Sequence, residues 1–362
     1  MTDDERAPGG MRYGWTTGAC ATAATAAAYT ALLTGTFPDP VRIVLPKGQR
    51  PAFALTREWL GDGQASAAVT KDAGDDPDVT HGAVVSVTVR PGQPGDGVVF
   101  HAGAGVGTIT KPGLPLQVGE PAVNPVPRTM MRDVVAEIAA ERGAGGDLDL
   151  EVSIEDGDEL ARHTWNPRLG IVGGLSVLGT TGIVVPYSCS AWIDSIRRGI
   201  DVARAEGLTH VAGCTGSTSE RTVLDEYGLP MEAMLDMGDF AGAVLKYLRR
   251  HPVPRLTVAG GIGKMSKLAD GHMDLHSKRS QVNFATLARI VREAGGSEAL
   301  AARVAEANTA LDALQVCQAD GVPLGDLVAR GARDVALDVL RAAPVDVDTL
   351  VIDRSGTIVG RT

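Results

Sequence analysis

The sequence has few aromatic residues, few cysteines and a shortage of positive charge. Phe, Trp and Tyr make up only 4% of the 362 residues, so the cores must be built from Ala, Val, Leu and Ile. The net charge of −10, from 34 basic and 44 acidic side chains, disfavours nucleic acid as a partner. It permits an anionic small ligand held by local basic loops. The four cysteines are scattered without CxxC pairing, which excludes a zinc site of that type, argues against a disulfide framework and predicts reduced thiols in the cytoplasm: Cys20, Cys189, Cys214 and Cys317.

Signals for a membrane are also missing. The acidic, polar N-terminus is not a signal-peptide pattern, and residues 1–11 are expected to form a flexible tail. Residues 169–193 carry no charge and are long enough to span a bilayer, but glycines, Pro186 and hydroxyl side chains make them too weakly apolar for a membrane helix. We therefore expect a soluble, cytoplasmic protein without a membrane partner.

Glycine is abundant, with 45 residues, well above a background of roughly 7%. This excess is typical of turns and of loops that approach a ligand closely. The length predicts two domains. Residues 12–167 have the pattern of an N-terminal α+β domain, and residues 168–362 that of a Rossmann-like, doubly wound and mostly parallel α/β domain with terminal helices and a hairpin.

Hydrophobic periodicity gives the expected elements. In the first domain they are a helix over 21–33, a hairpin of 41–45 and 52–55, strands 65–70, 84–89 and 148–154, and a helix over 129–142. Residues 103–127 are rich in Gly and Pro and predict a long ordered loop of the kind that carries function. In the second domain, strands 171–178, 183–185, 209–212, 231–237 and 256–259 alternate with helices 191–206, 219–227, 239–250 and 264–270, and helices 282–294, 298–319 and 324–342 precede a hairpin over 350–359.

Three loops that follow predicted strands contain small and hydroxyl residues: 213–220, 238–239 and 260–264. In an open α/β sheet such loops lie at the carboxyl ends of the strands, where ligands bind, so together they predict a ligand crevice. Each one taken alone is equally compatible with a tight turn. Residues 260–264 do not have the GxGxxG spacing, and Met265 stands where a P-loop requires Ser or Thr.

Two further groups of side chains point to chemistry. His272, Asp274 and His276 occupy alternate positions, which could suit a metal ligand set or proton transfer, but the pattern favours a polar loop whose histidines hydrogen-bond backbone or ligand groups over a metal site. Basic residues beside Gly, Pro and Asn predict rigid turns that aim cations at a polyanionic small ligand, although a solvated charged face is the alternative. These cations are Lys111, Arg128, Arg168, Lys264 and Lys278.

Six segments of the chain resemble the cobalt-precorrin-5B C1-methyltransferase family. They are GWTTGACATAA (14–24), DVTHGA (78–83), AGVGTITKPGLPLQVGEPAVNPVPR (104–128), NPRLGIVGGLSVLGTTGIVVP (166–186), AWIDSIRRGI (191–200) and GKMSKLADGHMDLHSKRS (263–280). The resemblance extends over about residues 12–290, and the C-terminal helices match more loosely. Trp15 stands where Tyr or Phe is common and Leu275 where Thr is common, which puts in doubt a hydroxyl role just before His276.

The resemblance implies an S-adenosylmethionine-dependent methyltransferase that converts cobalt-precorrin-5B to cobalt-precorrin-6A in cobalamin biosynthesis. Cobalt then enters only as part of the anionic tetrapyrrole substrate, and no protein-bound metal is expected. Methyl transfer depends on alignment, which can supply on the order of 7–11 kcal/mol. The alternatives are a non-catalytic cobalt or tetrapyrrole carrier, and a nucleotide-dependent enzyme that uses residues 260–264. Whether the chain is a monomer or a homodimer is left open.

The resemblance and the loop positions together give each candidate residue a role. The cofactor is expected at the two glycine loops, with Asp239 accepting from its ribose: Gly213, Thr215, Gly216, Ser217, Gly260, Gly261 and Gly263. The five cations above are expected to hold substrate carboxylates, and Arg128→Ala or Arg168→Ala to weaken substrate binding more than cofactor binding. His276 or His272 is expected to contact the cobalt face or take a proton, with Asp194 as a further proton acceptor and a solvated helix surface as its alternative.

Overall fold

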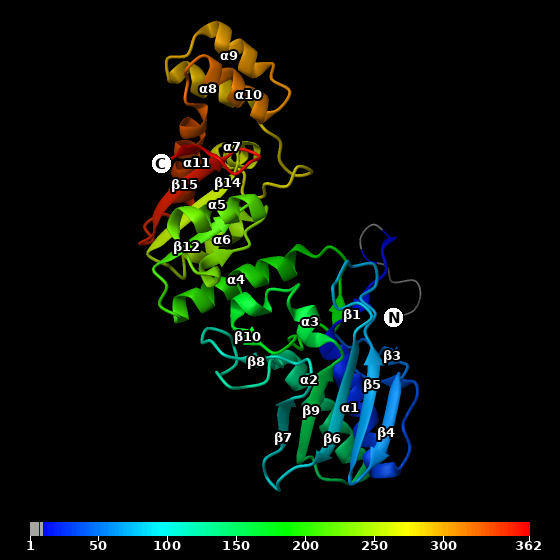
Figure 1. Cartoon of the computed structure of the whole chain (residues 1–362). Helices are drawn as coiled ribbons and strands as arrows, with labels where there is room; N and C mark the ends of the chain where they lie inside the picture. Colours follow the sequence, from blue (N-terminus) through cyan, green and yellow to red (C-terminus); the bar gives the residue numbers. More distant parts are fainter. Residues whose placement is uncertain (1–6, 8–9) are drawn as a thin grey trace. The chain divides into compact units, whose positions relative to one another are not determined.

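The computed structural model describes residue 7 and residues 10–362, and most of the predicted tail over 1–11 lies outside these residues. The chain divides into two compact units, the first ending at Cys189 and the second covering Ser190–Thr362 (Figure 1). The boundary therefore lies 22 residues later than the expected one after Pro167. The reason is strand pairing: β10 (Ile171–Val172) and β11 (Ile183–Val184) pair with β8 (Thr108–Ile109) and β1 (Gly14–Trp15) of unit 1.

Unit 1 is built on a five-stranded sheet in the order β4-β5-β6-β9-β7. All neighbours are antiparallel except β7 and β9, and two helices, α1 (Thr17–Thr34) and α2 (Pro125–Arg142), pack against each other, with α1 also packing on β5 and β6. The strands are β4 (Arg57–Gly61), β5 (Gln64–Thr70), β6 (Val84–Pro91), β7 (Val98–Ala102) and β9 (Leu148–Ile154). A separate short pair is formed by β2 (Val41–Arg42) and β3 (Ala52–Phe53), and α3 (Gly157–Ala161) follows β9.

Helix α1 shows why this part of the chain folds as it does. The Thr16 hydroxyl accepts from the Ala19 N–H at 3.2 Å and starts the helix, and Gly35 ends it with a left-handed φ of 78°. Nearly every side chain between them is buried, because alanine lets the helix lie close to both the sheet and α2. The expected start at residue 21 was late by one turn.

Unit 2 contains a five-stranded sheet in the order β13-β12-β14-β15-β16. The first four strands are parallel and only β16 is antiparallel. The prediction of an α+β part followed by a mostly parallel α/β part is therefore confirmed. The strands are β12 (His210–Cys214), β13 (Met234–Leu235), β14 (Arg255–Gly261), β15 (Asp346–Ile352) and β16 (Ile358–Arg361).

Helices cover both faces of this sheet. Side chains of α4 (Cys189–Ala205), α6 (Ala241–Leu248), α7 (Ile262–Ala269) and α11 (Leu324–Leu340) join one large core with alternate residues of the strands. The other face packs against α5 (Ser217–Tyr227) through Val223. The remaining helices are α8 (Phe284–Glu293), α9 (Glu298–Ala305) and α10 (Ala310–Ala319). The single helix expected over 298–319 is wrong, because Thr309 caps a new helix by accepting from the Asp312 N–H at 3.1 Å.

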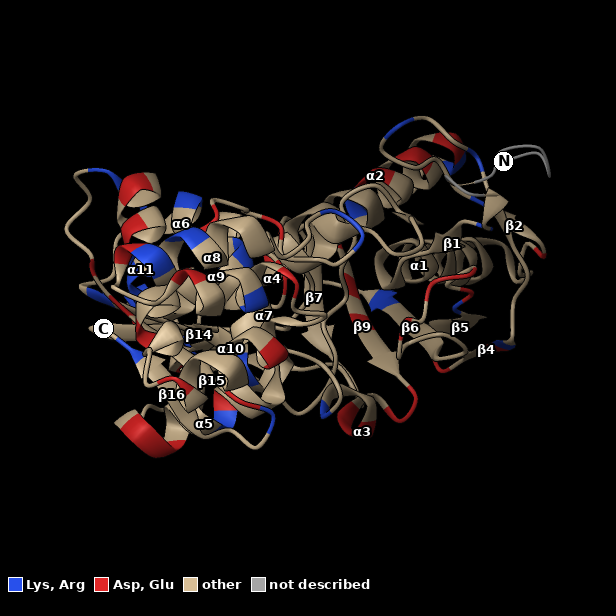
Figure 2. Cartoon of the chain, turned by 90° about the horizontal axis from the view of Figure 1, so that it is seen from above, with Lys and Arg blue, Asp and Glu red and all other residues tan. Residues whose placement is uncertain are grey.

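Charged side chains of both signs occur along the ribbon of each unit (Figure 2). Within the described residues, no helix is long and apolar enough to cross a membrane.

Candidate functional site

The strand order of unit 2 places a topological switch point between β12 and β14. From the carboxyl end of β12 the chain passes through α5 to β13 on one side, whereas from the carboxyl end of β14 it passes through the helices α7 to α11 to β15 on the other side. The two connections therefore leave the neighbouring strands β12 and β14 in opposite directions, which is the arrangement at which ligands bind in doubly wound folds.

The loops after these two strands contact each other directly. The Thr215 N–H donates to the Ala259 carbonyl at 3.0 Å, and the Lys264 Nζ donates to the Thr215 carbonyl at 2.9 Å. A Cβ at Gly260 would lie only 2.6 Å from the Thr215 Oγ1. The structure thus brings the predicted cofactor loops 213–217 and 260–264 into one site.

The glycines of this site fall into two groups. Gly260 is needed for packing against Thr215, and a Cβ at Gly213 would lie 3.0 Å from the Met237 sulfur. At Gly216 and Gly261, packing does not require glycine. Nothing lies within 4 Å of a Cβ built at either position, and neither residue has a left-handed φ. Gly263 meets only the Ala310 Cβ, at 3.9 Å, although glycine within a helix costs about 1 kcal/mol relative to alanine.

Both unexplained loop glycines begin helices. Gly216 is the N-cap of α5 and Gly261 the N-cap of α7, and neither helix start has a side-chain capping bond. The first N–H groups of such helices need a partner other than the helix itself. Gly216 and the adjacent Ser217 are exposed, so an anionic or hydroxylated ligand could reach these donors.

Asp239 lies beside these loops with an unused acceptor. Its Oδ1 is buried and accepts no hydrogen bond, although it forms an ion pair with the Lys264 Nζ at 3.1 Å. Its backbone carbonyl accepts from the Leu275 N–H at 2.8 Å. Lys267 donates to the Leu275 carbonyl at 2.9 Å, and burial lowers the pKa of this lysine. Because the Asp239 side chain is 22% exposed while its Oδ1 is buried, its other carboxylate oxygen could accept from a ligand hydroxyl, so the residues fit a ribose-containing cofactor.

The loop with the two histidines therefore lies next to Asp239. His276 has its Nδ1 accepting from the Lys278 N–H at 3.2 Å, so its neutral ring carries the proton on Nε2 and acts there as a donor. His272 is 3.8 Å from Asp270, and Lys278 itself is exposed. Among the residues that the structure describes, no three His, Cys, Asp or Glu side chains are grouped to hold a metal ion.

Asp194, the other predicted proton acceptor, lies on the surface of α4. Its side chain is 56% exposed and lies 3.6 Å from Arg198, one helical turn away. This is the arrangement of an ordinary helix-surface ion pair.

Arg128 does not point at a ligand, in contrast to the sequence interpretation. Its side chain is only 13% exposed, and all three of its nitrogens are used. They donate to the Val123 carbonyl at 2.8 Å, the Glu120 carboxylate at 2.7 Å and the Pro121 carbonyl at 3.1 Å. The turn aims the guanidinium as expected, but its target is the chain's own loop.

Lys111 and Arg168 come together in the same part of unit 1. The stem of Lys111 packs on Gly170, where a Cβ would lie 2.4 Å from the Lys111 Cγ. Arg168, two residues earlier, stacks on the Trp165 ring at 4.9 Å. Both cations are partly exposed at the corner formed by β8 and β10.

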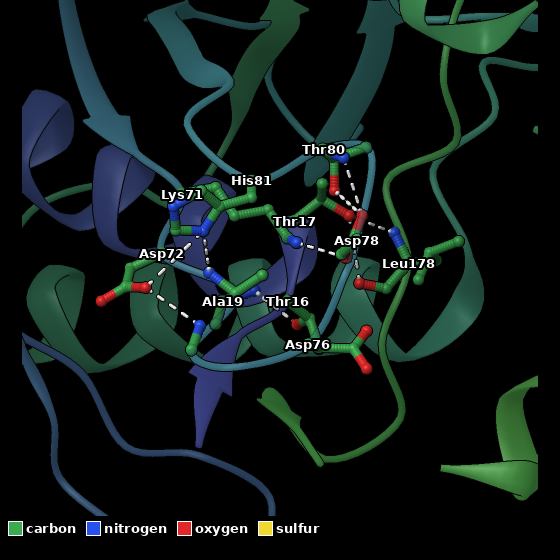
Figure 3. Close-up of polar contacts among 12 residues, drawn as sticks. Thr16, Thr17, Ala19, Lys71, Asp72, Asp76, Asp78, Thr80, His81 and Leu178 are labelled. Carbon is green, nitrogen blue, oxygen red and sulfur yellow. Dashed lines mark hydrogen bonds and ion pairs between the residues drawn. The ribbon is translucent and has the colours of Figure 1, made fainter. Parts of the chain in front are cut away.

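A buried ion pair in unit 1 was missed by the sequence analysis (Figure 3). Lys71 is 2% exposed and lies 2.6 Å from Asp78, whose other oxygen accepts from the Thr80 N–H at 2.7 Å and the Thr80 hydroxyl at 2.6 Å. Burial would raise the pKa of Asp78, but the Lys71 charge and the bonds from Lys71 and Thr80 outweigh it and lower that pKa. Burial also raises the pKa of Cys20 to about 12, so this thiol is neutral.

His81 lies on the same loop, with its Nδ1 accepting from the Ala73 N–H at 3.1 Å. Nearby, the Thr17 hydroxyl accepts from the Leu178 N–H at 2.9 Å (Figure 3). The Gly18 N–H donates to the Leu178 carbonyl at 2.9 Å. Three of the family-like segments, 14–24, 78–83 and 166–186, therefore meet in unit 1. Their unusual composition was the available signal, but composition does not show which side chains face each other.

Comparison with known proteins gives consistent matches. A family model described as CbiD matches residues 4–186, and one described as CbiD, C-terminal domain, matches residues 274–362. A protein of Paramagnetospirillum magneticum named cobalt-precorrin-5B C(1)-methyltransferase is 60% identical and covers 99% of both chains, and one of the same name from Rhodospirillum rubrum is 59% identical and covers 97% of both. The crystal structure of a cobalamin biosynthesis protein (cbiD) from Archaeoglobus fulgidus is 21% identical, covers 86% of this chain and 85% of that chain, and gives a TM-score of 0.39.

Proposed function

Since the chain belongs to the CbiD family, it is a methyltransferase of cobalamin biosynthesis that acts at C1 of cobalt-precorrin-5B, and we propose that S-adenosylmethionine supplies the methyl group at the carboxyl ends of β12 and β14. When bound, the donor would offer a sulfonium whose methyl carbon is open to attack by ring carbon C1, so that the C–C bond forms as the S–CH3 bond breaks and S-adenosylhomocysteine leaves as a neutral thioether. The protein has to hold the two reactants in line, which is a positioning task.

The glycines without a packing role carry this proposal. Gly216 and Gly261 keep open space over two uncapped helix starts, and Gly263 remains in a helix where alanine would be more stable. The protein's own packing gives no reason for glycine at these positions. Close approach of a ligand to the backbone supplies that reason.

The neighbouring side chains have separate tasks in this proposal. Asp239 accepts from the ribose hydroxyls through its Oδ2, while its Oδ1 forms the ion pair with Lys264. Thr215 and Ser217 lie at the turn from β12 into α5, where both are at least partly exposed to a ligand. Of the two histidines, His272 is the proposed proton acceptor, because the Nδ1 of His276 is already engaged.

Lys111, Arg168, Lys264 and Lys278 remain the proposed cations for substrate carboxylates, whereas Arg128 is withdrawn from this set. Cobalt is brought by the substrate in this scheme, and no protein-bound metal takes part.

The decisive experiment replaces the unexplained glycines by alanine. Gly216→Ala and Gly261→Ala are sterically compatible with the backbone, but alanine is a poorer N-cap than glycine, so each should lower the free energy of unfolding by no more than about 1 kcal/mol. Each added methyl group would occupy the space of the cofactor, so we expect the affinity for S-adenosylhomocysteine, measured by isothermal titration calorimetry, to fall by about tenfold or more.

Gly145→Ala is the matched control, because a Cβ there also meets nothing within 4 Å and its φ is not left-handed. Its affinity for S-adenosylhomocysteine should equal that of the unaltered protein. Anoxic incubation with methyl-labelled S-adenosylmethionine and the cobalt tetrapyrrole, followed by mass analysis of the ring, measures turnover. Unchanged binding in both crevice variants, or tighter binding of ATP or NAD than of S-adenosylhomocysteine, would contradict the proposal.

A further inference from the structure

A second cavity of unit 2, of about 610 Å³, lies between α4 and α6. Ile193 and Arg197 of α4 form one side, and residues 240–251 form the other. This volume is within the range of small-molecule sites. None of the side chains that line this cavity has a role in the proposed crevice at β12 and β14.

The cavity is strongly cationic in a chain of net charge −10. Arg197, Lys246, Arg249 and Arg250 line it, and within the described part of the chain none of the four forms an ion pair, although the Arg249 Nη1 donates to the Val339 carbonyl at 3.4 Å. The carboxylate that lines the cavity, Asp274, is already 2.5 Å from Arg279. Four cations that surround one space without acidic partners create a local positive potential, which attracts an anion with several charges.

The walls between these cations are flat and apolar. Phe240 and Tyr247 both line the cavity, together with Met273. The Tyr247 ring is held in place by its hydroxyl, which donates to Asp201 at 2.7 Å, by Arg197 at 5.9 Å from the ring centre, and by His251 stacked at 4.3 Å. Fixed aromatic side chains between cations form an apolar wall, which suits a ring system with an apolar body and carboxylates at its edge.

This cavity adjoins the proposed donor site through the chain itself. Phe240 directly follows Asp239, and Asp274 directly precedes Leu275, whose N–H donates to the Asp239 carbonyl. Two lining residues of the cavity are therefore direct neighbours in sequence of Asp239 and of its hydrogen-bond partner Leu275, so a ligand in the cavity would lie close to the proposed ribose acceptor.

We propose that the cavity between α4 and α6 binds the tetrapyrrole substrate by one edge of its ring, with Arg197, Lys246, Arg249 and Arg250 pairing with its acetate and propionate arms. This inference rests on the proposed function and assigns substrate recognition to four cations that are not among the five expected above to hold substrate carboxylates. The aromatic walls position the ring, and the guanidinium groups provide paired donors for carboxylates.

Uroporphyrin, a planar tetrapyrrole with eight carboxylates, is a suitable fluorescent probe. We expect the Arg197→Ala/Arg250→Ala double variant to bind it at least about tenfold more weakly than the unaltered protein. Coproporphyrin, with four carboxylates, should bind more weakly than uroporphyrin. Raising the salt concentration from 50 to 300 mM should weaken both complexes, because local attraction by the cavity is screened.

Arg289→Ala/Arg292→Ala is the matched control, because it removes the same charge from exposed positions on α8. It should bind uroporphyrin as the unaltered protein does. The single variant Arg250→Gln provides the same comparison if the double variant does not fold.

Titration of the same proteins with S-adenosylhomocysteine separates this inference from the proposed function. We expect its binding to be retained in the cavity variants. Equal uroporphyrin affinity in the cavity and control variants, or no binding by the unaltered protein, would overturn the cavity proposal while leaving the donor site intact. If the unaltered protein does not bind S-adenosylhomocysteine, the proposed donor site is wrong.

Discussion

Asp348 on β15 is the acceptor at the centre of a hydrogen-bonded group on the α5 face of the unit 2 sheet. Its Oδ2 accepts from the Tyr227 hydroxyl at 2.6 Å and the Thr257 hydroxyl at 2.8 Å, and its Oδ1 accepts from Arg255 at 2.9 Å. Because Thr257 donates to Asp348, it accepts from the Nε2–H of His210 at 2.7 Å. Burial raises the pKa of Tyr227 to about 12, so its hydroxyl remains a donor.

Asp348→Asn should lower the free energy of unfolding at pH 7 by about 2 kcal/mol, because hydrogen bonds to a charged acceptor are lost. Burial opposes ionisation of Asp348, but the bonds from Arg255, Tyr227 and Thr257 outweigh it and lower its pKa in the folded protein. This stabilisation is therefore present above the unfolded value of about 3.9 and is lost as the pH falls through the lower folded value.

Urea unfolding between pH 3 and 7 measures this effect. The difference between Asp348→Asn and the unaltered protein should be constant near neutrality and shrink below about pH 4. Asp338→Asn, at an exposed position of α11, is the control and should be neutral within about 0.5 kcal/mol. If the difference in the free energy of unfolding stays constant down to pH 3, the neighbours of Asp348 do not lower its pKa in the folded protein.

At the scale of elements, Arg128 connects helix α2 to the preceding loop. It sits in the first turn of α2 and donates back to Glu120, Pro121 and Val123. The loop therefore has a fixed course although it contains little regular structure. The short pairing of β8 with β10 holds its other end.

Arg128→Ala should lower the free energy of unfolding by about 2 kcal/mol and make residues 103–124 more sensitive to limited proteolysis. Arg132→Ala is a close control, because Arg132 lies over the same Phe100 ring at 5.0 Å, against 5.4 Å for Arg128. We expect little change in that variant. Equal proteolysis of the two variants would argue that the backbone bonds of Arg128 do not hold the loop.

At the scale of the whole molecule, each unit has a large hydrophobic core of its own. Cores of this kind unfold as separate cooperative units. The proposed donor crevice and the Asp348 group both belong to unit 2. Ligand binding and substitution of Asp348 should therefore change the stability of unit 2 alone.

Differential scanning calorimetry should resolve two unfolding transitions. S-adenosylhomocysteine at 100 times its Kd should stabilise one of them by about 2.7 kcal/mol, because it binds only the folded crevice. Asp348→Asn should lower the melting temperature of that same transition, which identifies it as unit 2. If S-adenosylhomocysteine instead raises the melting temperature only of the other transition, the one that Asp348→Asn does not change, that result contradicts a donor site in unit 2.

Local sequence patterns determined much of the fold. Strand β9 has the predicted bounds, and α5 and α7 begin within two residues of the expected starts. These elements depend on alternation, helical periodicity and capping residues, which act over a few neighbours in sequence. Edge strand β4 was missed because REWLG lacks an alternating apolar face, and its residues are largely exposed.

The sequence also determined where glycine and basic residues occur, and that loops 213–217 and 260–264 follow parallel strands. Only the tertiary structure decided their roles. Thr215 requires glycine at position 260 but not at 261, Arg128 points back at its own loop, and Arg197 lines the same cavity as Arg250. These distinctions depend on which atoms lie within a few ångströms, and such atoms come from segments tens of residues apart, whose approach no local pattern encodes.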